Sequence, residues 1–166
     1  MLEYAVHQWD MNKDSLYAAI RTDTKLNCCN YDYLVKLVVR HILNGKHRYD
    51  PLRNWMWDET NIVQIDHSLY QGTLLFVIPR NTCQPAAYEY LATKVEYGSC
   101  SGCDTLQDIQ SFIRSSLDQP PTPQQASDFM KLCLDIATNL VHPFPCPWNN
   151  DGWAEMKLDK EMEEHA

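Results

Sequence analysis

Hydrophobic positions follow a helical period in the first third of the chain. Between Asp14 and Ile20, apolar residues at 16, 17 and 20 predict a short helix with an acidic start. Asn30 is a suitable N-cap for a second helix, and Asn44-Gly45 supplies its stop. The residues that recur at helical spacing between these signals are Leu34, Leu37, Val38, His41 and Ile42. We interpret His41 as a hydrogen-bonded core histidine, with a ligand role as the alternative.

From residue 61 the pattern changes to that of strands. Residues 61–66 and 73–78 are β-rich runs separated by a turn that contains Gly72, which predicts a hairpin. The second run is apolar throughout, so both of its faces should be covered. Residues 88–97 alternate loosely and predict a third strand, although the beginning of this segment fits one helical turn equally well.

Two amphipathic helices follow, one from Asp104 to Leu117 and one from Thr122-Pro123 to Val141. These elements predict one α+β domain over residues 1–158, with a small, mainly antiparallel sheet of about three strands packed against four to five helices. Residues 159–166 are charged and should form a frayed tail. The predicted core contains Leu34, Leu37, Val38, Leu75, Val77, Ile109, Phe112, Phe129, Leu132 and Ile136.

Composition narrows the class of protein. The chain has 166 residues, 45% of them hydrophobic and 22% charged, which is ordinary for one globular domain. Its net charge is −8, with 14 Lys and Arg residues against 22 Asp and Glu, and no run of basic residues. This balance argues against direct nucleic-acid binding and favours a protein partner with a basic surface. No apolar run approaches the roughly 18 residues of a membrane span and no export signal is visible, so we expect a cytoplasmic protein that makes no membrane contact.

The segment from Tyr97 to Gln107 joins the third strand to the helix after it. It carries Cys100 and Cys103 at CxxC spacing, and Asp104 is placed to cap the helix in a capping box with Gln107. Small residues surround the thiols and give the backbone freedom that includes positive φ: Gly98, Ser99, Ser101 and Gly102. An odd total of seven cysteines without an export signal disfavours a disulfide framework.

The two thiols of this segment allow three interpretations. Cys100 and Cys103 form a redox pair if a helix N-terminus lowers a thiol pKa. They form a zinc site if His142 and Cys146, spaced H-x3-C, complete four ligands, with Cys28-Cys29 as alternative ligands. In the third interpretation the thiols are structural and the small residues serve close packing or present backbone N–H groups to an anion.

The loop at residues 46–60 mixes basic and aromatic residues around Pro51, which prevents a helix. Tyr49, Trp55 and Trp57 become partner-binding anchors if they are exposed. If they are not, the tryptophans plug the core from outside.

The string YGSCSGCDTLQ at residues 97–107 resembles a signature of a group of uncharacterised tailed-bacteriophage proteins. The similarity covers about residues 88–117 and implies a strand-to-helix link and a phage origin. Because no set of catalytic residues is evident, we expect a non-enzymatic protein that binds and modulates or inhibits a host protein, such as a component of a defence system, in the host cytoplasm. The alternative is a zinc-bearing or CxxC thiol-dependent protein that works through the cysteine corner.

Overall fold

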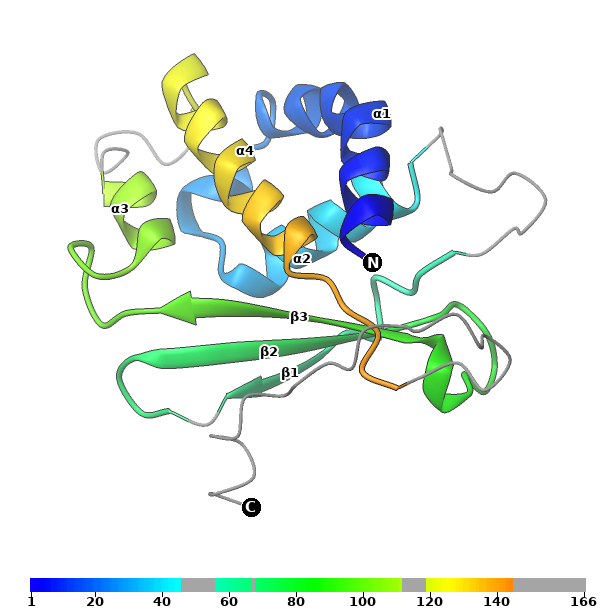
Figure 1. Ribbon diagram of the computed structural model, residues 1–166. Coiled ribbons are helices and arrows are strands. Elements are labelled where there is room, and N and C mark those ends of the chain that lie inside the picture. The colour runs from blue at the N-terminus through cyan, green and yellow to red at the C-terminus, as the bar shows by residue number, and fades with distance from the viewer. Residues whose placement is uncertain (46–55, 67, 112–118, 145–166) are drawn as a thin grey trace.

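A layer of helices covers one face of a three-stranded sheet (Figure 1), which confirms the predicted α+β class. The computed structural model describes residues 1–45, 56–66, 68–111 and 119–144. The helices are α1 (Leu2–Ile20), α2 (Tyr31–Val38), α3 (Thr105–Ser111) and α4 (Pro123–Thr138), with 3-10 turns η1 (Thr24–Cys28) and η3 (Ala87–Glu89) and a π-helical segment η2 (Val39–Leu43). The strands are β1 (Val63–Asp66), β2 (Gly72–Pro79) and β3 (Tyr90–Tyr97). No helix in these ranges has the length and apolar character needed to cross a lipid bilayer.

The sheet has the order β1-β2-β3 and is antiparallel throughout, with Gly72 opposite Tyr97 and Pro79 opposite Tyr90. The side chains that β2 buries against the helices are Leu74, Phe76 and Ile78. The predicted core residues Leu75 and Val77 are only half-buried. Placing them in the core was wrong because strand neighbours face opposite sides, and a run that is apolar at every position does not show which side the helices cover.

The other predicted core residues in the described ranges are buried, namely Leu34, Leu37, Val38, Ile109, Phe129, Leu132 and Ile136. Phe112 lies outside the described residues, as do the predicted continuation of α3 to Leu117, Cys146 and the tail at 159–166.

Helix α1 begins twelve residues before the predicted helix start at Asp14. Two of its buried positions are polar: Gln8 is fully buried and Asn12 nearly so. Asn12 Nδ2 lies 3.0 Å from the Gln8 carbonyl oxygen and 3.4 Å from the Ile42 carbonyl oxygen, so it donates within α1 and toward η2. These polar residues on the buried face interrupt the helical spacing of apolar residues. The sequence pattern therefore does not indicate the first half of the helix.

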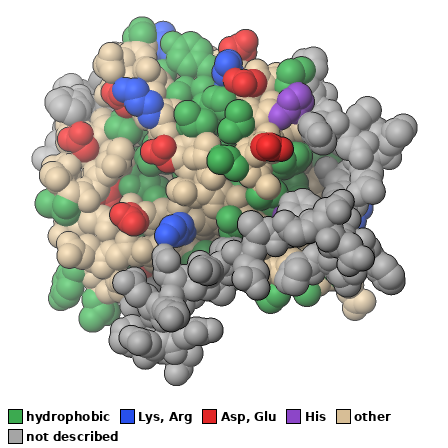
Figure 2. All heavy atoms as spheres, in the orientation of Figure 1, with side chains coloured by type: hydrophobic (Ala, Val, Ile, Leu, Met, Phe, Trp, Pro, Cys, Tyr) green, Lys and Arg blue, Asp and Glu red, His purple; other side chains and the backbone are tan. Residues whose placement is uncertain are grey.

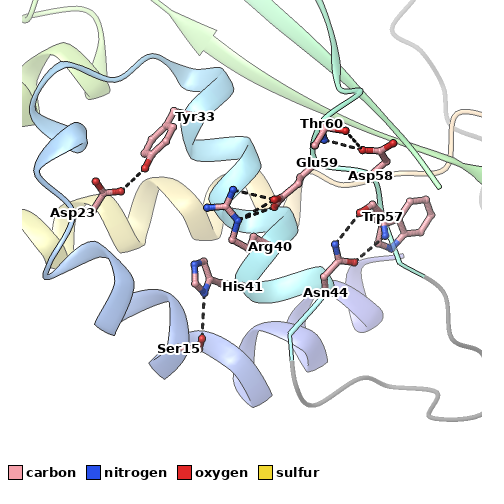
Figure 3. Close-up of polar contacts among 10 residues, drawn as sticks. All are labelled: Ser15, Asp23, Tyr33, Arg40, His41, Asn44, Trp57, Asp58, Glu59 and Thr60. Atoms are coloured by element: carbon pink, nitrogen blue, oxygen red, sulfur yellow. Dashed lines mark hydrogen bonds and ion pairs between the residues drawn. The ribbon is translucent and has the colours of Figure 1, made fainter. Parts of the chain in front are cut away.

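Helix α2 begins as predicted, because the Asn30 side chain accepts from the Tyr33 N–H at 3.1 Å. It continues directly into η2, and Asn44 follows. The Asn44 amide bonds both backbone groups of Trp57 at 2.8 Å, as Figure 3 shows. The Asn44 side chain thus pairs with the N–H and C=O groups of Trp57 as a neighbouring strand would, and it fixes the backbone at Trp57 against the helices.

Trp57 is 6% exposed. Its predicted role as an exposed partner-binding residue is therefore wrong. The alternative interpretation, in which the tryptophan of this loop packs into the core, holds for Trp57. Tyr49 and Trp55 lie outside the described residues.

Helix α4 starts with the predicted cap. The Thr122 side chain accepts from the Gln125 N–H, the Gln125 side chain accepts from the Thr122 N–H, and Pro123 opens the helix. Beyond the helix, Val141 exchanges two backbone hydrogen bonds of 2.9 Å with Ala92 of β3. The chain after α4 is thereby joined to the sheet.

Candidate dithiol site

Residues 98–104 connect β3 to α3, and we call them the cysteine turn. Gly98 and Asp104, at its two ends, are buried, whereas the five residues between them are exposed. Cys100 and Cys103 are free thiols on this exposed part. The turn therefore presents both sulfur atoms to solvent from a base fixed in the protein.

The Asp104 carboxylate supports the base of the turn. It accepts from the Gln107 N–H at 2.9 Å, the Tyr31 hydroxyl at 3.1 Å and the Gly98 N–H at 3.0 Å. The predicted cap is thus present, but the Gln107 side chain donates to the Gly98 carbonyl at 3.2 Å instead of completing a capping box. Tyr31, the first residue of α2, was not found from the sequence, because no local pattern relates it to a carboxylate 73 residues away.

Gly98 is required for space and not for positive φ. No described residue has a positive φ, so the predicted use of glycine for such a conformation was wrong. A Cβ on Gly98 would lie 2.3 Å from the Cys103 carbonyl oxygen and 2.5 Å from its Sγ. A Cβ on Gly102 would meet nothing closer than Cys100 Sγ at 4.0 Å. The two glycines therefore differ: the first allows the turn to fold back on itself, and the second has room for a side chain.

The two sulfur atoms lie 2.9 Å apart, within hydrogen-bonding reach. The Cys100 N–H also donates to Cys103 Sγ at 3.2 Å, and Ser99 Oγ lies 3.9 Å from the same sulfur. The hydrogen bond from the Cys100 side chain, supported by the Cys100 and Ser99 backbone and the Ser99 hydroxyl, lowers the pKa of Cys103. The Cys103 thiol also donates to the Cys100 carbonyl oxygen at 3.2 Å. Since the thiolate is the reactive form of a cysteine, the lowered pKa favours reaction at Cys103.

The pH dependence of alkylation should follow this arrangement. A lowered pKa means that Cys103 becomes thiolate, and reacts with iodoacetamide, at a lower pH than an ordinary cysteine. Cys100→Ala removes the thiol donor, so the midpoint of the rate profile for Cys103 should move to higher pH. Peptide-resolved mass spectrometry after timed alkylation measures both profiles. An unchanged midpoint in the variant would show that the Cys100 thiol does not stabilise the Cys103 thiolate.

The predicted zinc ligands do not come together. His142 Nδ1 lies 3.2 Å from the Tyr90 carbonyl oxygen, at the start of β3, whereas the cysteine turn follows the strand's end at Tyr97. Eight extended residues separate these positions by about 23 Å. Figure 1 shows the chain after α4 at the opposite end of β3 from the turn. The prediction that His142 and the cysteine pair share one metal ion is therefore wrong. The described ranges contain no group of three or more His, Cys, Asp or Glu residues that could hold a metal ion.

The chain's own chemistry is the only guide to what the turn does. No protein-family model, curated protein or solved structure matches this chain.

Other thiols in the protein have different surroundings. Burial raises the pKa of Cys29 to about 12, and burial also raises the pKa of Cys133 on α4. Gln110 Nε2 lies 3.7 Å from Cys29 Sγ and donates to the Leu26 and Cys29 carbonyls, so this cysteine is part of the packing between η1 and α3. These two thiols are held in the unreactive protonated form, unlike Cys103.

A second polar cluster surrounds η2 (Figure 3). His41 Nδ1 lies 3.2 Å from Ser15 Oγ, and Arg40 forms a two-point ion pair with Glu59 at 2.9 Å. Burial, followed by the charge of Arg40, lowers the pKa of His41. His41 is hydrogen-bonded as predicted, although it is half-buried and not in the core. The contacts join α1 and the segment before β1 to η2, which is a structural role.

Proposed function

We propose that this protein is a dithiol that exchanges with disulfides of other proteins, with Cys100 and Cys103 as its reacting groups. The observation that carries the proposal is the 2.9 Å separation of two exposed sulfur atoms on a turn with a buried, hydrogen-bonded base. A braced turn keeps the two thiols close without a covalent bond, which favours their joining and separating while the fold stays intact.

The lowered pKa of Cys103 supports an order of steps in which Cys103 reacts first. The Cys103 thiolate attacks one sulfur of the substrate disulfide, the S–S bond breaks, and the second substrate sulfur leaves as a thiolate that takes up a proton. The Cys100 thiol then loses its proton and attacks Cys103 Sγ, which breaks the mixed disulfide and releases the other substrate sulfur as a thiol. Two electrons and two protons pass to the substrate, and the pair becomes a disulfide. A low-molecular-weight thiol or dithiol returns it to the reduced form.

Reduction of insulin by dithiothreitol tests the proposal, because the separated chains precipitate and can be followed by turbidity. The protein should accelerate the reaction and Cys103→Ser should abolish the acceleration. Cys100→Ser lacks the second thiol, so it should accumulate a mixed disulfide with insulin, visible as a covalent adduct under non-reducing conditions. Cys83→Ser, at another exposed thiol, is the matched control and should behave as the unaltered protein. An unaltered protein without effect on insulin contradicts the proposal.

A second candidate function is binding to the basic surface of another protein, which the net charge of −8 favours. With the phage resemblance, that partner would be a host protein whose activity is modulated or inhibited. Asp and Glu side chains are scattered over the face seen in Figure 2 and do not gather in one patch there. Binding of this kind needs no thiol, so a salt-sensitive complex that survives Cys100→Ser would favour it over exchange.

A further inference from the structure

The turn between β1 and β2, residues 68–71, exposes two large hydrophobic side chains. Leu69 is 93% exposed and Tyr70 is 79% exposed, the highest values among large hydrophobic residues in the described part of the chain. Neighbouring side chains of this size on a tight turn form an apolar projection, and exposed apolar groups that gather in one place are typical of interaction sites. Tyrosine is also among the residues enriched at binding interfaces.

This projection lies at the same end of the sheet as the cysteine turn. Gly72, which follows the projection, pairs with Tyr97, which precedes the cysteine turn. Figure 1 shows the β1–β2 turn and the loop after β3 at the same side of the sheet, and Figure 2 shows hydrophobic side chains at that lower-left end. From the paired residues, Leu69 and Cys100 are each three positions away, so an extended peptide of about eight residues is long enough to reach both.

Hydrogen bonds also hold the turn between β1 and β2 to Tyr97, the residue of β3 that precedes the cysteine turn. The Tyr97 hydroxyl lies 2.9 Å from Asp66 Oδ1 and 3.0 Å from the Ser68 carbonyl oxygen, and the Ser68 N–H donates to Asp66 at 3.0 Å. A Cβ on Gly72 would lie 2.1 Å from Ser68 Oγ, so the turn is tightly closed at its base. The base of the apolar projection is therefore fixed to the end of β3 next to the cysteine turn, and such preorganisation reduces the entropy lost on binding.

We propose that Leu69 and Tyr70 dock the protein substrate of the dithiol, namely an extended polypeptide segment that carries apolar side chains near its disulfide. This inference rests on the proposed exchange function and adds the class of substrate to it. A small disulfide reaches the thiols without this contact, whereas a polypeptide substrate gains affinity from it. The docking residues thus select proteins over small molecules.

The double substitution Leu69→Ser with Tyr70→Ser separates these cases. With insulin as substrate, kcat/KM should fall about tenfold or more, since anchor side chains of this kind carry much of the binding energy. With 5,5′-dithiobis(2-nitrobenzoate), a small disulfide, the rate should stay unchanged. The matched control is Leu2→Ser with Tyr17→Ser, which removes the same exposed residue types from α1 and should leave both rates unchanged.

The outcomes distinguish the two levels of the proposal. If the unaltered protein reduces neither insulin nor the small disulfide, the exchange function fails and the docking role fails with it. If it reduces both, and the double variant keeps its rate with insulin, exchange stands and the docking role is overturned. If sedimentation shows a dimer that the double variant abolishes, the projection binds a second copy of the chain, and docking of substrate is again overturned.

Discussion

Trp57→Ala is expected to lower the free energy of unfolding by about 3–5 kcal/mol, the usual cost of removing a buried aromatic side chain. Trp57 is almost fully buried, and its ring centroid lies 6.3 Å from that of His142 at a tilt of 52°. The two hydrogen bonds of the Asn44 side chain hold the Trp57 backbone in place. The neighbouring side chains therefore cannot easily move into the space that the ring leaves. Thermal or urea denaturation measures the change, which for a chain of this size lowers Tm by roughly 6–20 °C.

Met56→Ala is the matched control, because Met56 is the neighbouring residue and its side chain is exposed. It should change the unfolding free energy by less than about 0.5 kcal/mol. His142 gives a second measurement: burial lowers its pKa, so uncovering the ring by Trp57→Ala should raise that pKa toward the ordinary value. Equal stability of the two variants would contradict the assignment of Trp57 to the core.

Gly98→Ala is expected to remove the dithiol chemistry. The added Cβ would overlap the backbone carbonyl of Cys103, and a side-chain rotation cannot relieve this contact. The turn must open, which separates Cys103 Sγ from the Cys100 N–H and thiol and pulls Gly98 from the Asp104 carboxylate. We expect loss of insulin reduction, a Cys103 alkylation midpoint moved to higher pH, and destabilisation of about 1–3 kcal/mol.

Gly102→Ala adds the same methyl group to the same turn, at a position where the nearest atom would be 4.0 Å away. Its activity, alkylation profile and unfolding free energy should match those of the unaltered protein. If both alanine variants lose activity equally, flexibility of the turn is required and the close packing at Gly98 does not explain its chemistry. If neither does, the observed closure of the turn is not needed for exchange.

The features that were predicted from the sequence depend on residues close together in the chain. Asn30, Asp104 and Thr122 each cap a helix through a bond to a residue three positions later. Such contacts follow from residue type and spacing alone. The three-strand antiparallel sheet likewise follows from short β-rich runs and the Gly72 turn.

The features that were missed depend on partners that the sequence does not place. Which face of β2 is buried follows from where the helices pack. Asn12 of α1 is buried where its amide donates to the Ile42 carbonyl of η2, and Gln8 is buried beside it. The zinc prediction placed His142 with Cys100 and Cys103 because of their residue types and spacing. The sequence does not show that His142 lies at the start of β3 while the two cysteines follow its end. Likewise, Tyr31 and Tyr97 brace the two turns of the candidate site through hydroxyl groups that no motif identifies.

The packing of α1 against α4 has a consequence for how the chain folds during synthesis. Arg21, just after α1, donates to the carbonyl of Pro121, and Asn27 donates to that of Gln119 at 2.7 Å. About 100 residues separate these partners, so at 5–20 residues per second the ribosome makes α4 roughly 5–20 s after α1. During that interval α1, whose Leu16 and Ile20 are fully buried in the finished protein, lacks its contact with α4. The surface of α1 that packs against α4 in the finished protein is therefore open to chaperones during that time.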